Sequence, residues 1–235
     1  MSLKIALVDC CFFIDFDNTI TVSDVLKDII RQFSINNDWG LLEKAWVEGQ
    51  IGAKECLEGQ LKNIRLSKKD LCCFLKDVHI DPYFVPLLSF LIKEGNQPVI
   101  LSDNFSLIIE CILKNHGIQG LVVYANGLDF YRGRLIPSFP YSNPSCPTCA
   151  HCKRIHLTSD MVENKKIIYI GDGRSDLCAA RVSDLVFAKD ALLQQLTKEG
   201  KWCVEFKSFK DINKYLVHKS LFVPSQAFDC QWKPV

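Results

Sequence analysis

The sequence has little excess of any one charge and no long hydrophobic run. Its 28 Lys and Arg residues nearly balance 27 Asp and Glu residues, which gives a formal net charge of +1. This composition gives no general attraction to nucleic acid or to anionic lipid. No run of 18 or more apolar residues occurs, so no membrane-spanning helix is expected. Internal repeats and low-complexity linkers are also lacking, which leaves an ordinary globular composition.

A secretory leader is not expected either. The start, MSLKIALVDCCFFIDFD, places Lys4 before an apolar run, but Asp9 interrupts that run and no small-residue cleavage pattern follows. The twelve cysteines are spread along the chain and do not have the spacing of a small secreted disulfide scaffold. We therefore expect most thiols to be reduced and buried in a cytoplasmic enzyme.

Strand-like apolar runs recur along the 235 residues, at 11–17, 98–103, 121–125, 166–172 and 184–189. Helical patterns lie between the later runs, as in 106–117, which ends at Gly117. Strands that alternate with helices predict an α/β fold, with a Rossmann-like parallel sheet covered by helices. The segment 127–139 consists of two short strand-like runs and predicts a β-hairpin.

Residues 22–80 interrupt this alternation with consecutive helical patterns. Ser23 and Ser67 are the expected N-caps of the first and the last of these helices. Helices alone, inserted after the first strand, predict a small helical cap. The expected domains are a Rossmann-like core, residues 1–21 and 81–235, and a cap, residues 22–80.

Two carboxylates stand where the first strand ends. In the stretch FFIDFDNTIT, residues 12–21, Asp15 and Asp17 follow three apolar residues. Side chains two apart on a strand share a face, so these carboxylates would lie a few Å apart and repel each other. A positive charge is therefore expected near them.

Further polar residues stand at or near other strand ends, namely Ser102 in LSDN, Lys153 in CAHCKR, and Asp172 and Asp176 in GDGRSD. Gly171 and Gly173 allow a tight turn at the strand-to-helix junction, so that Asp172 and Asp176 can face one spot. Open α/β sheets bind ligands at the carboxyl edge of their strands. Three or four carboxylates that converge there would repel each other, and Mg²⁺, which takes oxygen ligands and substrate phosphate, would offset this repulsion.

This set of residues suits phosphoryl transfer. A carboxylate held against Mg²⁺ can act as a nucleophile on phosphorus, and a second carboxyl can protonate the leaving oxygen and later activate water. Ser102 and Lys153 would supply a hydrogen-bond donor and positive charge to the phosphate oxygens. Lys165 and Lys166 compete with Lys153 for this role, but they stand at the start of a strand and are expected in solvent at its far end.

The motifs DFDNTIT, LSDN, the lysine and GDGRSD, in this order, resemble the four motifs of the haloacid dehalogenase superfamily of phosphatases over residues 11–190. The resemblance implies that Asp15 is the nucleophile and that Asp17 is the general acid/base. It implies phosphate binding by Asn18, Thr19, Ser102 and Lys153, and Mg²⁺ coordination by Asp15, Asp17 through its backbone carbonyl, and Asp172, with Asp176 supporting the metal ligands.

The helical insertion is similar to the cap of the phosphoserine-phosphatase-like branch of this superfamily. The segments CPTCAHCKR and SDLVFAKDALL most closely resemble the methionine-salvage phosphatases that act on 2-hydroxy-3-keto-5-methylthiopentenyl-1-phosphate. SDN at 102–104 differs from the SGG typical there and resembles the phosphoethanolamine/phosphocholine phosphatases. The expected substrate is a small phosphomonoester, first an enol phosphate of the methionine-salvage type. Phosphoethanolamine, phosphocholine and phosphoserine are alternatives, as is a non-catalytic phospho-ligand or metal-binding protein on the same fold.

Two acids are candidates for substrate specificity. Asp24 lies nine residues after Asp15, where phosphoserine phosphatases place a substrate-binding Glu, or it is a first-turn acid favoured by the helix dipole. Asp103 stands where the phosphoethanolamine/phosphocholine phosphatases place an acid against the substrate amine, or it has a local role, pairing with Asn104 or capping the following helix. If both acids face the substrate, they favour an amine or a polyhydroxylated leaving group.

Cys146, Cys149 and Cys152 form a C-x2-C-x2-C pattern that suits Zn²⁺ or another soft metal. A structural zinc site normally has four ligands, and His156 is the candidate for the fourth. The alternative is a thiol-rich loop whose cysteines pack or form one disulfide.

Overall fold

The structure is a computed structural model that describes residues 3–146, 148–159, 162–218 and 221–223. The chain divides into two compact units, the first made of Met1–Asp15, Asp81–Val99 and Lys153–Val235, and the second of Phe16–Ile80 and Ile100–Cys152. The predicted cap segment, residues 22–80, lies within the second unit together with residues 100–152. The proposed boundary between a core and a cap stays a prediction.

The first unit contains a parallel sheet. Its strands are ordered β2 (Cys10–Ile14), β6 (Lys166–Gly171), β7 (Leu185–Ala188) and β8 (Val204–Glu205), and each neighbouring pair is parallel. The core residues of β2 and β6 are at most 1% exposed: Phe12, Phe13, Ile14, Ile168, Tyr169 and Ile170. Strands buried on both faces read as continuous apolar runs, which is the pattern found in the sequence.

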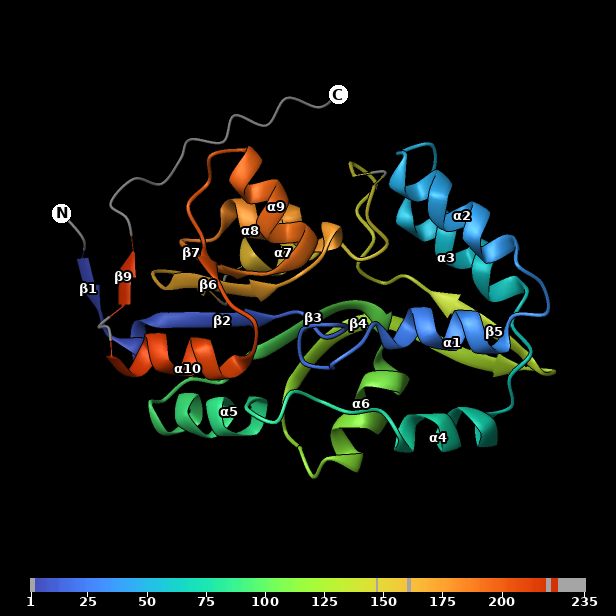
Figure 1. The fold of residues 1–235 in the computed structure, drawn as a ribbon, viewed down its shortest axis with the longest axis horizontal. Helices are drawn as coiled ribbons and strands as arrows, with labels where there is room; N and C mark the ends of the chain where they lie inside the picture. The colour runs from blue at the N-terminus through green and yellow to red at the C-terminus, as the bar shows by residue number, and fades with distance from the viewer. Residues whose placement is uncertain (1–2, 147, 160–161, 219–220, 224–235) are drawn as a thin grey trace. The chain divides into compact units, whose positions relative to one another are not determined.

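Helices cover both faces of this sheet, as the alternating pattern predicts (Figure 1). They are α5 (Phe84–Lys93), α7 (Arg154–Leu157), α8 (Leu177–Val182), α9 (Asp190–Lys198) and α10 (Phe209–His218). In Figure 1, α7, α8 and α9 lie on one face and α5 and α10 on the other. The rings of Phe84 and Phe209 join α5 to α10, with their centroids 5.2 Å apart. Beside this sheet, β1 (Leu3–Ile5) pairs antiparallel with β9 (Leu221–Val223).

The second unit begins with four consecutive helices, as the pattern of residues 22–80 predicts. They are α1 (Val25–Phe33), α2 (Asp38–Val47), α3 (Ala53–Lys62) and α4 (Lys68–Lys76). Ser67 is confirmed as the N-cap of α4, because its hydroxyl accepts the N–H of Asp70 at 3.1 Å. The prediction for α1 was wrong by one residue, because the N-cap is Asp24 and the hydroxyl of Ser23 instead donates to Asp28.

The rest of the second unit comprises most of β3 (Val99–Phe105), α6 (Ser106–Asn115), β4 (Val122–Tyr131) and β5 (Arg134–Ser138), with the strands ordered β5-β4-β3. The predicted hairpin is confirmed, because β4 and β5 pair antiparallel. Its two-residue turn has positive φ at both Arg132 (48°) and Gly133 (73°), which is the backbone that a type I′ turn requires.

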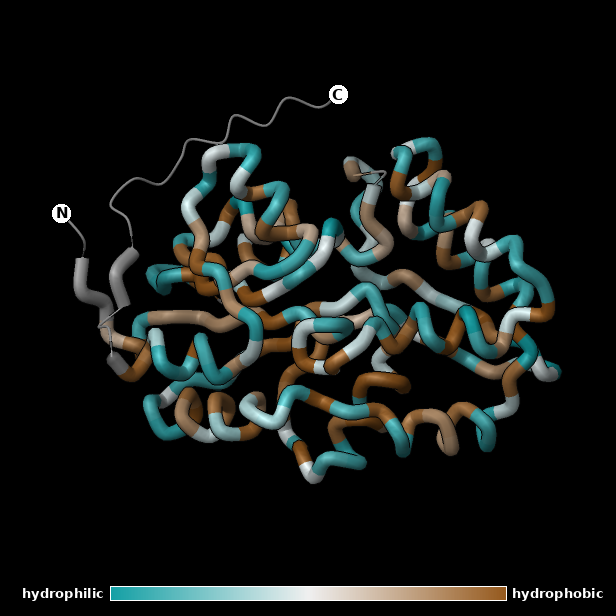
Figure 2. The backbone as a smooth tube through the Cα atoms, viewed as in Figure 1, coloured by the Kyte–Doolittle hydropathy of each residue, from teal (hydrophilic) through white to brown (hydrophobic). Residues whose placement is uncertain are grey.

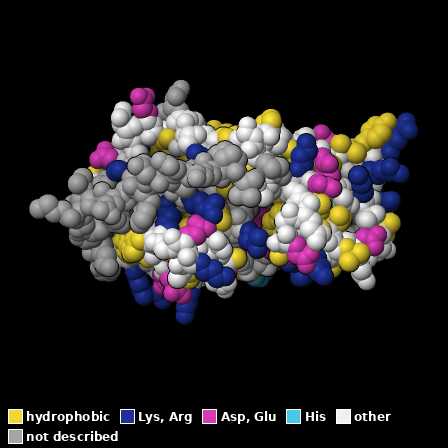
Figure 3. Space-filling view, turned by 90° about the horizontal axis from the view of Figure 1, so that it is seen from above, with side chains coloured by type: hydrophobic (Ala, Val, Ile, Leu, Met, Phe, Trp, Pro, Cys, Tyr) yellow, Lys and Arg dark blue, Asp and Glu magenta, His cyan; other side chains and the backbone are white. Residues whose placement is uncertain are grey.

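The hydropathy of the backbone follows this architecture. Strands of both units are mostly hydrophobic, whereas hydrophobic and hydrophilic residues alternate along the helices (Figure 2). On the face shown in Figure 3, Lys and Arg side chains are interspersed with Asp and Glu side chains, in keeping with the near-neutral net charge. Within the described residues, no helix is both long and apolar enough to cross a membrane.

Candidate active site

A buried ion-paired cluster occupies the end of β2 in the first unit. Asp15 follows the last residue of β2, and its N–H donates to the carbonyl of Ile170 at 2.9 Å, which continues the pairing with β6. The Lys153 ammonium, on the residue before α7, donates to Asp15 Oδ1 at 2.5 Å and to Asp176 Oδ1 at 2.6 Å. Side-chain exposure is 1% for Lys153 and 8% for Asp15. One buried cation therefore holds two buried carboxylates.

Asp176 is fixed by hydrogen bonds to both of its oxygens. The Tyr169 hydroxyl donates to Oδ1 at 2.6 Å, while the N–H groups of Asp172 and Gly173 donate to Oδ2 at 3.1 and 2.9 Å. A Cβ atom at Gly171 would lie 2.5 Å from Asp176 Oδ2, so this close approach requires glycine. Tyr169 is a site residue that the sequence did not reveal, because it looks like one more apolar residue of a buried strand.

The cluster has the donor set of a hard divalent cation. Asp15, Asp172 and Asp176 each place a carboxylate oxygen within 4.8 Å of the others, and they are the only such His, Cys, Asp or Glu group found among the described residues. Burial and the neighbouring Asp176 raise the pKa of Asp15 well above its ordinary value, and Lys153 opposes this shift. Three carboxylates facing one ammonium leave excess negative charge, and oxygen ligands of this kind fit Mg²⁺.

Asp17, in the second unit, is held by the first turn of α1. Its Oδ1 accepts the N–H groups of Val25 and Leu26 at 2.9 and 3.4 Å, and its Oδ2 accepts the side-chain amide of Asn104 at 2.9 Å. Burial, with the charge of Asp24, raises the pKa of Asp17 to about 8, although these hydrogen bonds oppose the shift. A carboxyl with this pKa is mostly protonated at neutral pH and can donate a proton.

The loop after Asp17 is tightly wound. Asn18 has a positive φ of 51°, and its N–H lies 3.1 Å from Thr21 Oγ1 and 3.0 Å from the carbonyl of Ser23. Thr19 is 2% exposed, and its N–H donates to the carbonyl of Phe16 at 3.3 Å. These contacts explain the shape of the loop, and phosphate binding by Asn18 and Thr19 stays a prediction.

The residues of the LSDN motif form a network within the second unit. Ser102 is 1% exposed, and its hydroxyl oxygen accepts the N–H of Asn104 at 3.1 Å. Asp103 Oδ1 accepts the N–H of His151 at 2.8 Å, and its carbonyl accepts the side-chain amide of Asn126 at 2.6 Å. His151 Nδ1 lies 2.9 Å from the carbonyl of Ser102. Asp103 thus holds the 141–152 loop, a role that neither sequence alternative included.

Asp24 is the N-cap of α1, whereas the sequence predicts either a substrate contact or a first-turn acid favoured by the helix dipole. Its Oδ1 accepts the N–H of Lys27 at 3.0 Å, and burial raises its pKa. The capping role is thereby observed, and a contact with substrate stays a prediction.

Family membership follows from a comparison of the whole chain with known families. A sequence model of the family described as Putative Phosphatase matches residues 10–212. The chain belongs to this family. The predicted enzyme class, a phosphoric monoester hydrolase, is confirmed with it.

Individual relatives agree with this assignment. The chain is 28% identical over 221 residues to a 2-hydroxy-3-keto-5-methylthiopentenyl-1-phosphate phosphatase of Brevibacillus brevis, covering 92% of this chain and 96% of the relative. It is 25% identical over 198 residues to the phosphoserine phosphatase of Homo sapiens, covering 83% and 87%. A solved phosphoserine phosphatase with a phospho-aspartyl intermediate analogue has a TM-score of 0.68 at 18% identity, covering 88% of this chain and 98% of that one. The predicted Rossmann-like fold is thereby confirmed.

The cysteine loop does not assemble the predicted soft-metal site. Cys146 Sγ and Cys149 Sγ lie 3.7 Å apart, but Cys152 is buried and does not join them in a metal-ligand group of the described residues. His156 is 8% exposed, and burial lowers its pKa to about 4. The structure gives Zn²⁺ no support at this loop.

Of the two competing lysines, Lys166 lies where the sequence predicts. Its ammonium pairs with Asp184 at 2.8 Å, and its side chain is 46% exposed. Lys166 is therefore a surface residue at the start of β6, as expected, whereas Lys153 is almost completely buried.

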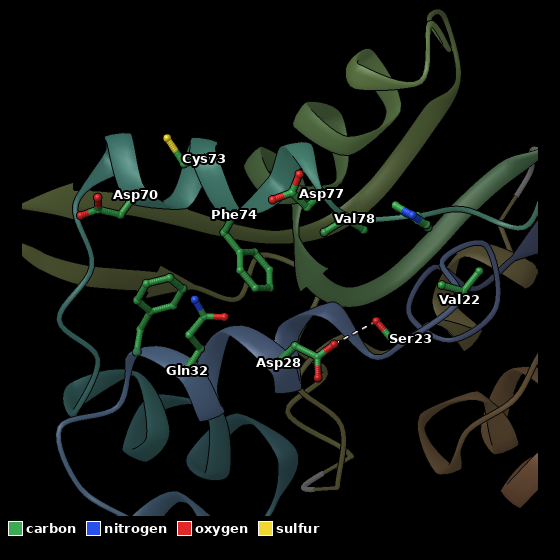
Figure 4. Close-up of a pocket in the computed structure, with 11 residues that line it drawn as sticks. Val22, Ser23, Asp28, Gln32, Asp70, Cys73, Phe74, Asp77 and Val78 are labelled. Carbon is green, nitrogen blue, oxygen red and sulfur yellow. Dashed lines mark hydrogen bonds between the residues drawn. The ribbon is translucent and has the colours of Figure 1, made fainter.

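A pocket of about 760 Å³ opens in the second unit between α1 and α4 (Figure 4). Three acids line it: Asp28 and Asp70 accept hydrogen bonds from the hydroxyls of Ser23 and Ser67, and Asp77 is the C-cap residue of α4. None of the carboxylates of the ion-paired cluster lines this pocket. Asp28 and Asp70 are explained by their positions in the first turns of α1 and α4.

Proposed function

We propose that the protein hydrolyses a small phosphomonoester with the help of Mg²⁺ and forms an aspartyl-phosphate on Asp15. The observation that carries this proposal is the ion-paired cluster, in which a buried ammonium bridges Asp15 and Asp176. A buried cation stabilises negative charge that develops next to it, and Lys153 orients the Asp15 carboxylate and opposes the rise in its pKa that burial causes.

In the proposed first step, a carboxylate oxygen of Asp15 attacks phosphorus while the bond from phosphorus to the leaving oxygen breaks. Asp17, mostly protonated because of its raised pKa, gives its proton to the leaving oxygen. Asp17 then accepts a proton from water as that water attacks the phosphorus, which releases phosphate and regenerates the Asp15 carboxylate.

The covalent chain supports this division of labour between Asp15 and Asp17. A residue spans at most about 3.6 Å, so two residues separate the two Cα atoms by about 7 Å or less. The acid/base therefore stays within reach of the nucleophile. Lys153 opposes protonation of Asp15, whereas burial raises the pKa of Asp17 and favours its protonated form, which fits a nucleophile and a proton donor.

For the metal, we propose Asp15 and Asp172 as carboxylate ligands, with the backbone carbonyl of Asp17. Both oxygens of Asp176 are engaged by donors of the chain, which fits a role in positioning Lys153 and the 172–173 turn. Bound Mg²⁺ would supply positive charge to the phosphate oxygens and offset the repulsion between the carboxylates. Phosphate binding by Asn18, Thr19, Ser102 and Lys153 completes the proposed site.

The proposed substrate is an enol phosphate of the methionine-salvage type. The Brevibacillus brevis relative supports it, since that protein is aligned over 92% of this chain. Phosphoethanolamine and phosphocholine were alternatives because Asp103 could contact the substrate amine. The contact of Asp103 with the N–H of His151 weighs against that role. Phosphoserine is the second candidate, supported by the human relative and by the structural likeness to a substrate-bound phosphoserine phosphatase with a TM-score of 0.68.

Hydrolysis of an aryl phosphate with and without Mg²⁺ tests the reaction. Asp15→Asn should lose about a thousandfold or more in kcat, because it removes the nucleophile and keeps the shape. Asp129→Asn, an exposed carboxyl on β4, is the matched control and should retain wild-type rates. Equal rates for wild type and Asp15→Asn, or no hydrolysis by the wild type, would overturn the proposal.

A panel of the methionine-salvage enol phosphate, phosphoserine, phosphoethanolamine and phosphocholine tests the substrate, scored by kcat/KM. We expect the enol phosphate to rank first. Asp103→Ala should lower turnover of all esters alike, because it removes the acceptor of the His151 N–H that holds the loop and the side chain would not contact an amine. A selective loss of the amino esters by about tenfold would instead assign Asp103 to the substrate amine.

A further inference from the structure

Two cysteines of the loop that precedes Lys153 form a close pair within the second unit. The Cys146 and Cys149 sulfur atoms lie 3.7 Å apart, and both residues are partly exposed. A disulfide bond is about 2.05 Å long, so a small rotation of the two side chains, with a shift of the backbone between them, would bring these sulfurs to bonding distance. We propose that Cys146 and Cys149 are a redox-active dithiol that exchanges with low-molecular-weight disulfides, with Cys146 as the attacking thiol.

The surroundings of Cys146 favour its thiolate. Its sulfur lies 3.6 Å from the hydroxyl of Thr148, and the backbone N–H groups of Thr148 and Cys149 also approach it. Partial burial opposes ionisation, but the hydrogen bonds from Thr148 and Cys149 outweigh it and lower the pKa of Cys146 below its ordinary value. The thiolate is the nucleophile in thiol–disulfide exchange, so this geometry activates Cys146.

Other described cysteines have the opposite environment. Burial raises the pKa of Cys10 to about 12 and that of Cys56 to about 11. Burial likewise raises the pKa of Cys11 and Cys203. These four cysteines are therefore expected to react more slowly than Cys146.

The third cysteine of the pattern is structural. Cys152 is 4% exposed, and its backbone N–H donates to the carbonyl of Tyr141 at 2.9 Å. The side-chain amide of Asn143 lies 3.9 Å from Cys152 Sγ, and the Asn143 carbonyl accepts the N–H of Cys146 at 2.8 Å. These contacts anchor the ends of the loop, and they leave Cys149 as the partner that can resolve a mixed disulfide on Cys146.

The exchange balances with one small disulfide, such as oxidised glutathione, as the oxidant. The Cys146 thiolate attacks one glutathione sulfur, so a protein–glutathione disulfide forms while the glutathione disulfide breaks and one glutathione leaves as thiolate. The Cys149 thiolate then attacks Cys146 Sγ and expels the second glutathione. In sum, two protein thiols are oxidised to a disulfide, and one oxidised glutathione is reduced to two thiols, which carry the two protons.

Oxidation of Cys146 and Cys149 to a disulfide should also change the hydrogen bonding at the start of α3. The carbonyl of Thr148 accepts the N–H of Ala53, the first residue of α3, at 3.0 Å. Thr148 lies between the two cysteines, so closing a disulfide across it would displace this carbonyl. Loss of the contact leaves one of the first N–H groups of α3 without its protein acceptor, so its amide hydrogen should exchange faster.

The test combines mass spectrometry after oxidised glutathione with alkylation rates at pH 7. In the wild type we expect a Cys146–Cys149 disulfide and alkylation of Cys146 about tenfold faster than that of Cys72, an exposed cysteine on α4. Cys149→Ser should trap glutathione on Cys146, and Cys146→Ser should form neither product. Cys72→Ser is the matched control and should behave as the wild type.

Hydrogen exchange of the peptide that contains Ala53 supplies the second readout. It should rise several-fold on oxidation of the wild type and stay unchanged in Cys146→Ser. Alkylation of Cys146 no faster than that of Cys72, or a Cys149→Ser protein that carries no glutathione on Cys146, would overturn the proposal. Both of these readouts are independent of phosphatase activity.

Discussion

Asp15 and Asp17 lie two residues apart along the chain, yet different groups hold their carboxylates. In the first unit, Asp15 is paired with the ammonium of Lys153 at 2.5 Å. In the second unit, Asp17 accepts N–H groups from the first turn of α1 and from Asn104. In the first environment the ammonium opposes the rise in the pKa of Asp15 that burial causes, and in the second burial raises the pKa of Asp17 to about 8. One short sequence motif thus carries two acids with different partners, which fits the different tasks proposed for them.

The largest expected effect on stability comes from removing the ammonium of Lys153, which is paired with Asp15. Lys153→Met should lower the free energy of unfolding by about 3 to 5 kcal/mol without Mg²⁺, because it leaves two buried carboxylates unpaired. Urea denaturation in the presence of a chelator measures this loss, and added Mg²⁺ should recover part of it.

Lys166→Met is the matched control for this change. It removes an ammonium from an exposed ion pair with Asp184 and should cost less than about 1 kcal/mol. Similar losses for the two variants would show that Lys153 does not hold the carboxylates as described.

The raised pKa of Asp17 should make the stability of the folded protein depend on pH. Asp17 has a folded pKa of about 8, above that of the unfolded chain, so between about pH 4 and pH 8 the folded state keeps a proton that the unfolded state has lost. Stability without Mg²⁺ should therefore fall as pH rises through this window. Asp17→Asn should remove this component, on the order of a few kcal/mol at pH 8 and nothing near pH 3.5.

Unfolding midpoints for wild type and Asp17→Asn across pH 3.5 to 8.5 check this prediction. Asn104→Ala is a second variant for this test. It deletes the side-chain amide that donates to Asp17 Oδ2 and leaves the Asp17 carboxyl in place. A difference between wild type and Asp17→Asn that does not change with pH would mean that Asp17 is ionised throughout.

A smaller effect is expected at Tyr169, a residue of β6 whose hydroxyl donates to Asp176. Tyr169→Phe deletes the hydrogen bond to Asp176 Oδ1 and should cost about 1 to 3 kcal/mol of stability. We expect kcat to fall by about tenfold with KM nearly unchanged, because Asp176 would hold Lys153 less firmly. Steady-state kinetics separate the two parameters. Tyr131→Phe, at an exposed position of the hairpin, is the control, and an equal fall in kcat there would contradict this role.

The smallest effect concerns Asp24, whose charge and capping function can be separated. Asp24→Ala should cost about 1 kcal/mol as a lost N-cap, whereas Asp24→Asn should cost only a few tenths because Asn caps well. Thermal denaturation measures both, with Ser67→Ala at α4 as a comparison cap. If Asp24→Asn is stable but raises KM, the charge of Asp24 contacts the substrate.

The sequence predicts the acidic groups Asp15 and Asp172 because they stand at strand ends, directly after β2 and β6. Lys153 instead lies just before α7, and it is favoured over Lys166 because Lys166 stands at the start of a strand. Strand ends are visible as breaks in an apolar run, so the groups there can be found without a structure. The α/β class follows from the same breaks.

The remaining partners could not be found in this way. Asn104 contacts Asp17 across 87 residues of sequence, and no periodicity links positions so far apart. Tyr169 reads as an apolar core residue, although its hydroxyl is part of the site. The contact of Asp103 with the N–H of His151 depends on a loop whose course has no sequence signal. Local patterns show which residues are polar, but packing decides which of them meet.

Gly171 illustrates what this packing means for inherited variation. Every amino acid other than glycine carries a Cβ atom, and at position 171 this atom would lie 2.5 Å from Asp176 Oδ2 and 2.9 Å from the ring of Tyr169. No missense allele at this codon is conservative, although the residue has no side chain to lose. Gly40 has no heavy atom within 4 Å of its added Cβ and should accept the same alleles. A genetic screen for loss of function would then mark codon 171 as if it encoded a catalytic group.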